Sequence, residues 1–136
     1  MNSRTIRHAA ALAALTLCAA GATAQTWEYK SYKKGGQGGQ YNKDNYVLGS
    51  VSLEEKDGKA SMQLNAGVMD ACRRAEMPAQ VTRSDSEITI EPEVTLAGCE
   101  KWRLVIRSDG SGGRREVWRG DKWVDTRWDH GLTPKK

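Results

Sequence analysis

The sequence predicts a mainly β domain, a small antiparallel β-barrel or β-sandwich built from hairpins and held by one disulfide. Three observations support this fold class. Short segments of alternating apolar and polar residues recur along the chain, turns rich in glycine and aspartate separate them, and two cysteines follow an N-terminal segment typical of export signals. Short alternating segments between such turns are typical of antiparallel all-β folds.

The size and composition of the chain fit one soluble globular domain. It has 136 residues, of which 38% are hydrophobic and 28% charged, and a chain of this length seldom forms two independent cores. Three cysteines and two histidines are too few for a zinc cage. We therefore expect no metal and no other cofactor.

Residues 1–24 have the three parts of a cleaved export signal. Two arginines make the start positive, an apolar run of twelve residues follows, and Ala22-Thr23-Ala24 offers the small side chains that a signal peptidase accepts. A bilayer span takes about 20 apolar residues, so we expect cleavage before Gln25 and no membrane span. Residues 25–136 would then form a single β domain in the periplasm or outside the cell.

Two other interpretations of the N-terminal segment are open. The segment could form a buried helix, or Cys18 could carry a lipid, although Leu17 is bulkier than the residue that lipoprotein processing normally requires at that place. The Ala-rich signal favours a bacterial source, where export leads to an oxidising compartment.

Cys72 and Cys99 are the two cysteines of the predicted mature chain, and we expect them to form a disulfide. The bond would close a loop of 28 residues, which in the chain-entropy model stabilises the fold by about 3.6 kcal/mol. A redox-active pair is the alternative, but the spacing is far from the Cys-x-x-Cys pattern of such pairs.

The first strand is predicted over residues 27–32, which are rich in aromatic side chains. Residues 33–45 follow and contain Gly35-Gly36-Gln37-Gly38-Gly39. This segment has few apolar groups to bury, so we expect a flexible Gly-rich loop. It lacks the Gly-Lys-Ser/Thr ending of a phosphate-binding loop.

Asp57-Gly58 predicts a two-residue β-hairpin, because a type I′ turn needs positive φ at both central residues. Counting outward from this turn fixes the register and sorts apolar from polar residues onto opposite faces. The expected inner pairs are Leu53–Met62, Val51–Leu64 and Gly49–Ala66, and the outer pairs are Ser52–Gln63 and Glu54–Ser61.

The next segments are predicted with less regular patterns. Residues 65–76 could form a short helix that ends before Pro78. A second hairpin over 80–91 places Val81 near Ile90. Residues 102–107 alternate as a strand with one apolar face. The core residues that we expect are Val51, Leu53, Met62, Leu64, Trp102, Leu104 and Ile106.

A last hairpin is predicted over residues 114–128, with Gly120-Asp121 at its turn, of type II′. In this register Trp118 faces Trp123 on one side of the hairpin, while Val117 and Val124 share the other. Neither face is free of charged neighbours, so the sequence leaves open which face is buried. We expect Trp118 and Trp123 to stay partly exposed near the turn.

The formal net charge of +4 is unevenly distributed. Residues 44–100 hold five basic and eleven acidic side chains, and residues 101–136 hold ten basic and five acidic ones. An acidic middle and a basic end suggest two self-complementary parts of one domain rather than a nucleic-acid surface. We therefore expect no nucleic acid among the partners.

The sequence offers little for catalysis. His130, beside Asp129, has no Gly-x-Ser-x-Gly nucleophile motif to serve, so we expect an exposed histidine in a C-terminal tail. Glu91 and Glu93 could share a strand face as a carboxylate pair, but solvated charges on an edge strand are the simpler interpretation. We expect a protein that is not an enzyme, with a small hydrolase as a third possibility.

The C-terminal third combines tryptophan and arginine, which are enriched where proteins contact one another. The same tryptophans could stack on sugar rings, or simply build the aromatic core of a chain that has no phenylalanine. The candidate binding residues are Trp118, Trp123, Arg119, Lys122, Arg114 and Arg127. The leading hypothesis is a periplasmic or secreted binding protein that acts on an unknown protein partner, as an inhibitor or accessory subunit. A module that binds envelope glycans or surfaces is the alternative.

Overall fold

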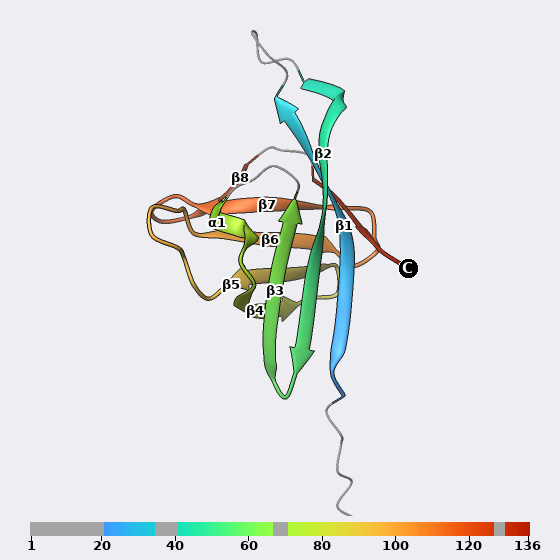
Figure 1. The fold of residues 1–136 in the computed structure, drawn as a ribbon, viewed down its shortest axis with the longest axis vertical. Helices are drawn as coiled ribbons and strands as arrows, with labels where there is room; N and C mark the ends of the chain where they lie inside the picture. Colours follow the sequence, from blue (N-terminus) through green and yellow to red (C-terminus); the bar gives the residue numbers. More distant parts are fainter. Residues whose placement is uncertain (1–20, 35–40, 67–70, 127–129) are drawn as a thin grey trace, which may run out of the picture.

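The structure, a computed structural model, describes residues 21–34, 41–66, 71–126 and 130–136, and for residues 32–34, 41–47, 66, 71, 74 and 130 it describes the backbone alone. Within this part of the chain the protein is mainly β, with one nine-stranded antiparallel sheet and one helical turn (Figure 1). The strands are β1 (Thr23–Lys34), β2 (Tyr41–Lys56), β3 (Lys59–Ala66), β4 (Met77–Arg83), β5 (Glu87–Pro92), β6 (Trp102–Arg107), β7 (Gly113–Trp118), β8 (Trp123–Asp125) and β9 (His130–Pro134), and the helix is α1 (Ala71–Arg74). None of the helices described is long and apolar enough to cross a membrane.

The strand order in the sheet is β6-β5-β4-β3-β2-β1-β9-β7-β8, and β6 also pairs with β7. Strands that follow one another from β1 to β6 are therefore neighbours, as hairpin connections favour. Figure 1 shows β1, β2 and β3 running along the molecule, with β4 to β7 lying across them behind. Both groups of strands contribute to the buried core, which includes Trp27, Leu53, Met62, Leu104 and Leu132.

The hairpin of β2 and β3 has the predicted register. Leu53 pairs with Met62 and Val51 with Leu64. At the turn, Asp57 has φ of 53° and Gly58 has φ of 74°, as a type I′ turn requires. The turn thus sets which side chains enter the core.

The other hairpins and the core also agree with the sequence. Val81 pairs with Ile90 in β4–β5, and Trp118 pairs with Trp123 in β7–β8. All the expected core side chains are buried, namely Val51, Leu53, Met62, Leu64, Trp102, Leu104 and Ile106. The disulfide between Cys72 and Cys99 is present.

The last turn is tighter than expected. Gly120 has the positive φ, 77°, that a type II′ turn needs at its first central residue. The amide of Asp121 donates to the carbonyl of Arg119 at 2.9 Å, so a three-residue hydrogen-bonded turn lies inside the hairpin end.

The boundaries of the expected Gly-rich loop differ in the structure. The Gly-rich loop was expected over residues 33–45, but β1 continues to Lys34 and β2 begins at Tyr41. The backbone pair Lys34–Tyr41 extends the hairpin because ladder hydrogen bonds do not depend on apolar side chains. Residues 35–40, which hold the glycines of this loop, lie outside the described residues.

The C-terminal end is a strand rather than a tail. β9 begins at His130 and pairs with β1, which places Leu132 in the core at 0% exposure. Leu132 is the single large apolar residue of a short polar segment, so no alternation marked it. The tail that we expected at His130 is corrected for the backbone, while the histidine side chain lies outside the described part.

Candidate functional site

The β7–β8 hairpin places two tryptophans on the outer face of the sheet. Val117 is 3% exposed and joins the core, and because successive residues of a strand face opposite sides, Trp118 faces outward. It is 37% exposed. Its ring meets Trp123 edge to face, with the ring centroids 5.3 Å apart. The expectation that this tryptophan pair stays partly exposed is confirmed.

Two cations from the neighbouring chain segment lie against these rings. Lys101 precedes β6, and its Nζ is 5.4 Å from the ring centroid of Trp123 and 5.9 Å from that of Trp118. The guanidinium of Arg103 lies 4.2 Å from the Trp123 centroid. All three distances fall within the range of cation–π attraction. We call Trp118, Trp123, Lys101 and Arg103 the tryptophan patch.

The alternation of β6 explains why both cations are there. Trp102 is buried at 3% exposure, so the side chains on either side of it in the sequence point to the outer face. β6 and β7 pair with Arg103 opposite Glu116, which sets Arg103 beside the β7–β8 hairpin.

A network of ion pairs adjoins the patch and centres on a buried carboxylate. Glu116 is 7% exposed. Arg103 Nε donates to its Oε2 at 2.6 Å, and Arg114 Nε donates to its Oε1 at 2.9 Å. Arg114 also donates to Glu87 at 2.8 Å. Each oxygen of the buried carboxylate therefore has a charged donor, which is the condition for burying such a group.

This network also explains a departure from the expected pattern of β6. Val105 was expected on the solvent side, yet it is 2% exposed. It pairs directly with Arg114 and follows Arg103 by two residues on the same face. The aliphatic stems of such long side chains can cover an apolar neighbour while their charged ends bind elsewhere.

The electrostatics of Glu116 result from two opposed effects. Burial alone would raise the pKa of its carboxyl, but the hydrogen bonds and charges of Arg114 and Arg103 outweigh burial and hold the pKa below its ordinary value. Hydrogen bonds to Glu87 and Glu116 likewise raise the pKa of Arg114. The Glu116 carboxyl group is therefore ionised at neutral pH.

The structure brings together only some of the predicted binding residues. Trp118 and Trp123 touch, whereas Arg114 is half-buried in the ion-pair network. Arg119 and Lys122 lie exposed at the adjoining turn, and Arg119 pairs with Glu100 at 2.6 Å. Arg127 lies outside the described residues.

Neither Lys101 nor Arg103 was among the predicted binding residues. The inward position of Trp102 already implied that both face outward. Their distance from Trp123 depends on the β6–β7 register, which the glycine-rich turn over 108–112 sets and which the sequence alone did not fix.

Ion pairs link the acidic middle of the chain to its basic end, as the charge distribution led us to expect. Glu91 pairs with Lys101, Glu87 with Arg114 and Glu100 with Arg119. The positive charge around the tryptophan patch is thus largely balanced within the molecule.

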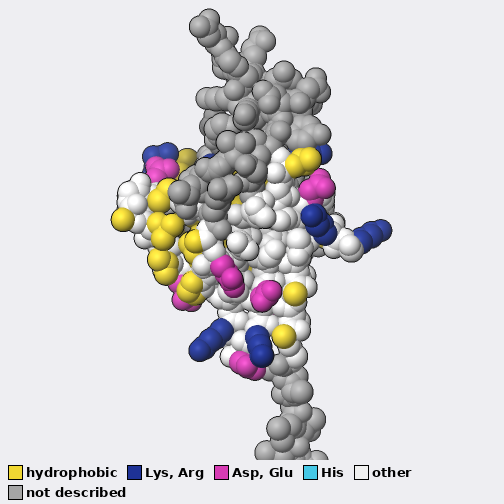
Figure 2. Space-filling view, in the orientation of Figure 1, with side chains coloured by type: hydrophobic (Ala, Val, Ile, Leu, Met, Phe, Trp, Pro, Cys, Tyr) yellow, Lys and Arg dark blue, Asp and Glu magenta, His cyan; other side chains and the backbone are white. Residues whose placement is uncertain are grey.

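The loop between β5 and β6, which ends at Lys101 of the patch, carries two exposed apolar side chains. Val94 and Leu96 in this loop are 46% and 36% exposed, and the amide of Trp118 donates to the carbonyl of Lys101 at the end of the loop. Figure 2 shows hydrophobic side chains gathered on the side of the molecule where this loop lies in Figure 1. Apolar groups that gather on a surface often mark a contact site.

Acidic side chains in the described ranges bear on metal binding and on carboxylate catalysis. Among these residues, no group of three or more His, Cys, Asp or Glu side chains could hold a metal ion. Glu91, one of the carboxylates considered for catalysis, forms an ion pair with Lys101 at 2.8 Å.

No protein-family model, curated protein or solved structure matches the chain.

Proposed function

We propose that the protein is a non-catalytic binding protein whose tryptophan patch docks onto a protein partner, as an inhibitor or accessory subunit. The main observation behind this proposal is the partly exposed Trp118–Trp123 pair, with Lys101 and Arg103 against its rings. Tryptophan and arginine dominate the energetics of protein contacts because both give large contact area and hydrogen bonds. The exposed side chains of Val94 and Leu96 would widen this surface.

The arrangement of the rings favours a protein partner over a glycan. A sugar ring stacks on an open aromatic face, but the guanidinium of Arg103 lies 4.2 Å from the centroid of Trp123. The 68° angle between the two indoles also gives no common flat platform. A glycan-binding module remains the second candidate through the exposed ring of Trp118.

Two observations support a role without catalysis and without nucleic acid. The carboxylate of Glu116 has a lowered pKa because its arginine partners outweigh its burial, and a general acid needs a raised one. The cations Lys101, Arg103 and Arg114 each pair with an acid of the same face, whereas phosphate binding needs unbalanced positive charge.

We also infer that the protein is exported and loses residues 1–24. The disulfide supports an oxidising compartment. β1 begins at Thr23, and the first buried core side chain in it is Trp27, so cleavage before Gln25 would spare the core. The intact mass of the protein recovered from a bacterial periplasm measures the cut: a chain that keeps residues 1–24 overturns this inference.

The sheet, we infer further, curls into a barrel rather than a sandwich. β6 stands first in the strand order and β7 stands near its other end, yet β6 and β7 pair from Trp102–Val117 to Ile106–Gly113. β7 meets β9 at Gly113–His130. Inter-strand amide contacts measured by NMR along β6–β7 and at this meeting point test the closure.

The function is tested by capture of partners from a periplasmic extract with the tagged mature protein. We expect a specific protein to bind the native chain and to be lost with Trp118→Ala and Trp123→Ala. Leu48→Ala is the matched control, because Leu48 is an exposed apolar residue at 52% exposure on β2. Equal capture by all variants would overturn the patch as the binding site.

Titration with peptidoglycan fragments, followed by tryptophan fluorescence, separates the two candidates. No saturable change is expected for a protein-binding patch. A saturable change that Trp118→Ala abolishes would replace the leading proposal with the glycan-binding one.

A further inference from the structure

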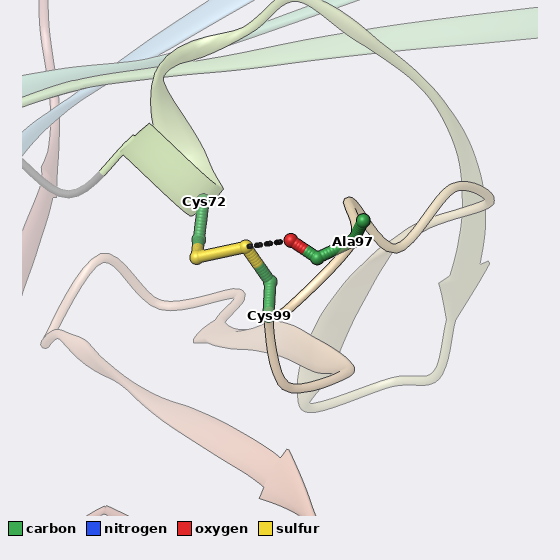
Figure 3. Close-up of a disulfide and its surroundings, with 3 residues drawn as sticks. All are labelled: Cys72, Ala97 and Cys99. Atoms are coloured by element: carbon green, nitrogen blue, oxygen red, sulfur yellow. Dashed lines mark hydrogen bonds between the residues drawn. A yellow bond between two sulfur atoms is a disulfide. The ribbon is translucent and has the colours of Figure 1, made fainter.

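The disulfide lies close to the tryptophan patch along the chain. Cys99 stands near the end of the loop between β5 and β6, two residues before Lys101. Its partner Cys72 is in α1, and Figure 3 shows the bond joining this helical turn to the loop. A second contact places α1 beside β6, because the guanidinium of Arg73 lies 6.0 Å from the ring centroid of Trp102.

The tethered loop supplies Lys101 to the patch. The carbonyl of Lys101 accepts a hydrogen bond from the amide of Trp118 at 2.9 Å, and Lys101 Nζ lies near both indoles. Glu100, between Cys99 and Lys101, pairs with Arg119 at the β7–β8 turn. The position of this loop therefore decides whether Lys101 meets the two tryptophans.

We propose that the Cys72–Cys99 bond is a redox-sensitive latch that holds the Lys101 side of the tryptophan patch in place, so that reduction weakens partner binding. This proposal rests on the proposed function of the patch. Both cysteines are half-buried rather than enclosed, and attack by a dithiol requires such access.

The chemistry is thiol–disulfide exchange with a dithiol reductant. One thiolate of the dithiol attacks a sulfur of the bond and forms a mixed disulfide, and its second thiol then displaces the remaining cysteine. The dithiol is oxidised to a disulfide, while Cys72 and Cys99 receive two electrons and two protons. The carbonyl oxygen of Ala97, 3.9 Å from the Cys99 sulfur, can accept a hydrogen bond from the thiol formed (Figure 3).

Reduction should loosen the loop and spare the core. Neither cysteine belongs to the buried cluster, whose members include Val51, Leu53 and Leu104. The bond joins two surface segments, α1 and the loop. Segments of this kind open at lower free energy than core strands do.

Amide hydrogen exchange tests the latch without any partner. In the mature protein treated with a dithiol, and in the Cys72→Ser/Cys99→Ser variant, we expect the Trp118 amide to exchange at least about tenfold faster, a local loss of about 1.4 kcal/mol. The amides of Val51 and Leu53 report opening of the core, and they should lose some protection because the bond also stabilises the whole fold by chain entropy. Unchanged exchange at Trp118 overturns the latch, and so does acceleration at Trp118 by the same factor as at the two core amides, because opening there is then global.

Circular dichroism gives a second readout from the indole pair. Two tryptophans whose centroids are 5.3 Å apart couple their electronic transitions, and Trp118→Phe identifies the resulting couplet by removing it. We expect reduction to change the couplet while the backbone signal persists. A couplet that reduction leaves unaltered contradicts the latch.

Partner capture with the oxidised and the reduced protein completes the test. We expect binding at least about fivefold weaker after reduction, the lower end of typical coupling between two sites. Equal binding in both states overturns the redox control. If the oxidised protein captures nothing, the proposed function fails, while the exchange and dichroism results still decide whether the bond holds the loop.

Discussion

Arg103 contacts Trp123 and Glu116 at the same time: its guanidinium lies 4.2 Å from the indole centroid, and its Nε donates to the carboxylate at 2.6 Å. The buried carboxylate thus fixes the cation that lies on the half-buried ring of Trp123. A contact surface whose side chains are held before binding loses less conformational entropy when a partner arrives. The ion-pair network is therefore a support for the tryptophan patch as well as a cover for Val105.

The exposure of the tryptophan pair predicts mild effects on stability. Trp118→Ala and Trp123→Ala should each lower the free energy of unfolding by less than about 2 kcal/mol, because truncating a fully buried tryptophan typically costs about 3–5 kcal/mol. Trp102→Ala is the matched control, since Trp102 is 3% exposed. Urea unfolding curves measure all three, and a loss in the buried range for Trp118 or Trp123 would assign that residue to the core.

The buried carboxylate predicts a larger effect. Glu116→Gln should lower the free energy of unfolding by about 3 kcal/mol, because Arg103 and Arg114 then lose the negatively charged carboxylate that both of them pair with. The same change should weaken partner capture, since Arg103 would no longer be fixed over Trp123.

Glu100→Gln is the control for a surface ion pair. The side chains of Arg119 and Glu100 are 59% and 48% exposed, and pairs of this kind contribute about 0–1 kcal/mol. Chemical denaturation should therefore show a clearly larger loss in the free energy of unfolding for Glu116→Gln than for Glu100→Gln. Equal losses would show that the Glu116 network stabilises no more than an ordinary surface pair.

Much of this geometry could be predicted where a turn residue fixes a register. Asp57-Gly58 and Gly120-Asp121 each lie between strands that are adjacent in sequence, so Val51–Leu64 and Trp118–Trp123 follow by counting. The apolar alternation then separates the buried face from the exposed one for most positions of these hairpins.

The features that were missed depend on contacts between distant parts of the chain. β9 pairs with β1, and the sequence near Leu132 carries no sign of that partner. Lys101 reaches Trp123 only because β6 and β7 align across a five-residue turn. Local patterns predict hairpins, but such pairings form through packing of the whole sheet.

The lowered pKa values predict a loss of stability in acid. Hydrogen bonds from Arg83 hold the pKa of Glu55 below its ordinary value, and the pKa of Glu116 is lowered as described. A carboxyl group whose pKa is lower in the folded state stabilises the fold above its unfolded pKa, about 4.3. This contribution is lost as the pH falls through the folded pKa.

Urea unfolding midpoints between neutral pH and roughly pH 3 measure this loss. We expect the midpoint of the native protein to fall with pH below the ordinary carboxyl range, and that of Glu116→Gln to fall less steeply. Glu55→Gln should have a smaller influence, since the Arg83 and Glu55 side chains are 46% and 28% exposed and water screens the pair. Parallel pH curves for the native protein and Glu116→Gln would contradict a lowered pKa at Glu116.

Gly113 predicts a steric requirement at the place where β7 meets both β6 and β9. A Cβ at this position would lie 2.5 Å from the carbonyl oxygen of Val105 and 2.8 Å from a methyl carbon of Leu132. The first of these atoms belongs to the backbone of a paired strand, so relief requires the strands to separate. Gly113→Ala should therefore lower the free energy of unfolding by about 2–3 kcal/mol, as overpacking typically does.

Gly120→Ala is the control for this substitution. A Cβ at Gly120 would have no atom within 4 Å, but the φ of this residue is 77°. A left-handed conformation costs an L-residue about 1–2 kcal/mol. Thermal unfolding should give a lower midpoint temperature for Gly113→Ala than for Gly120→Ala. The reverse order would show that β6, β7 and β9 are not packed as closely around Gly113 as the structure has them.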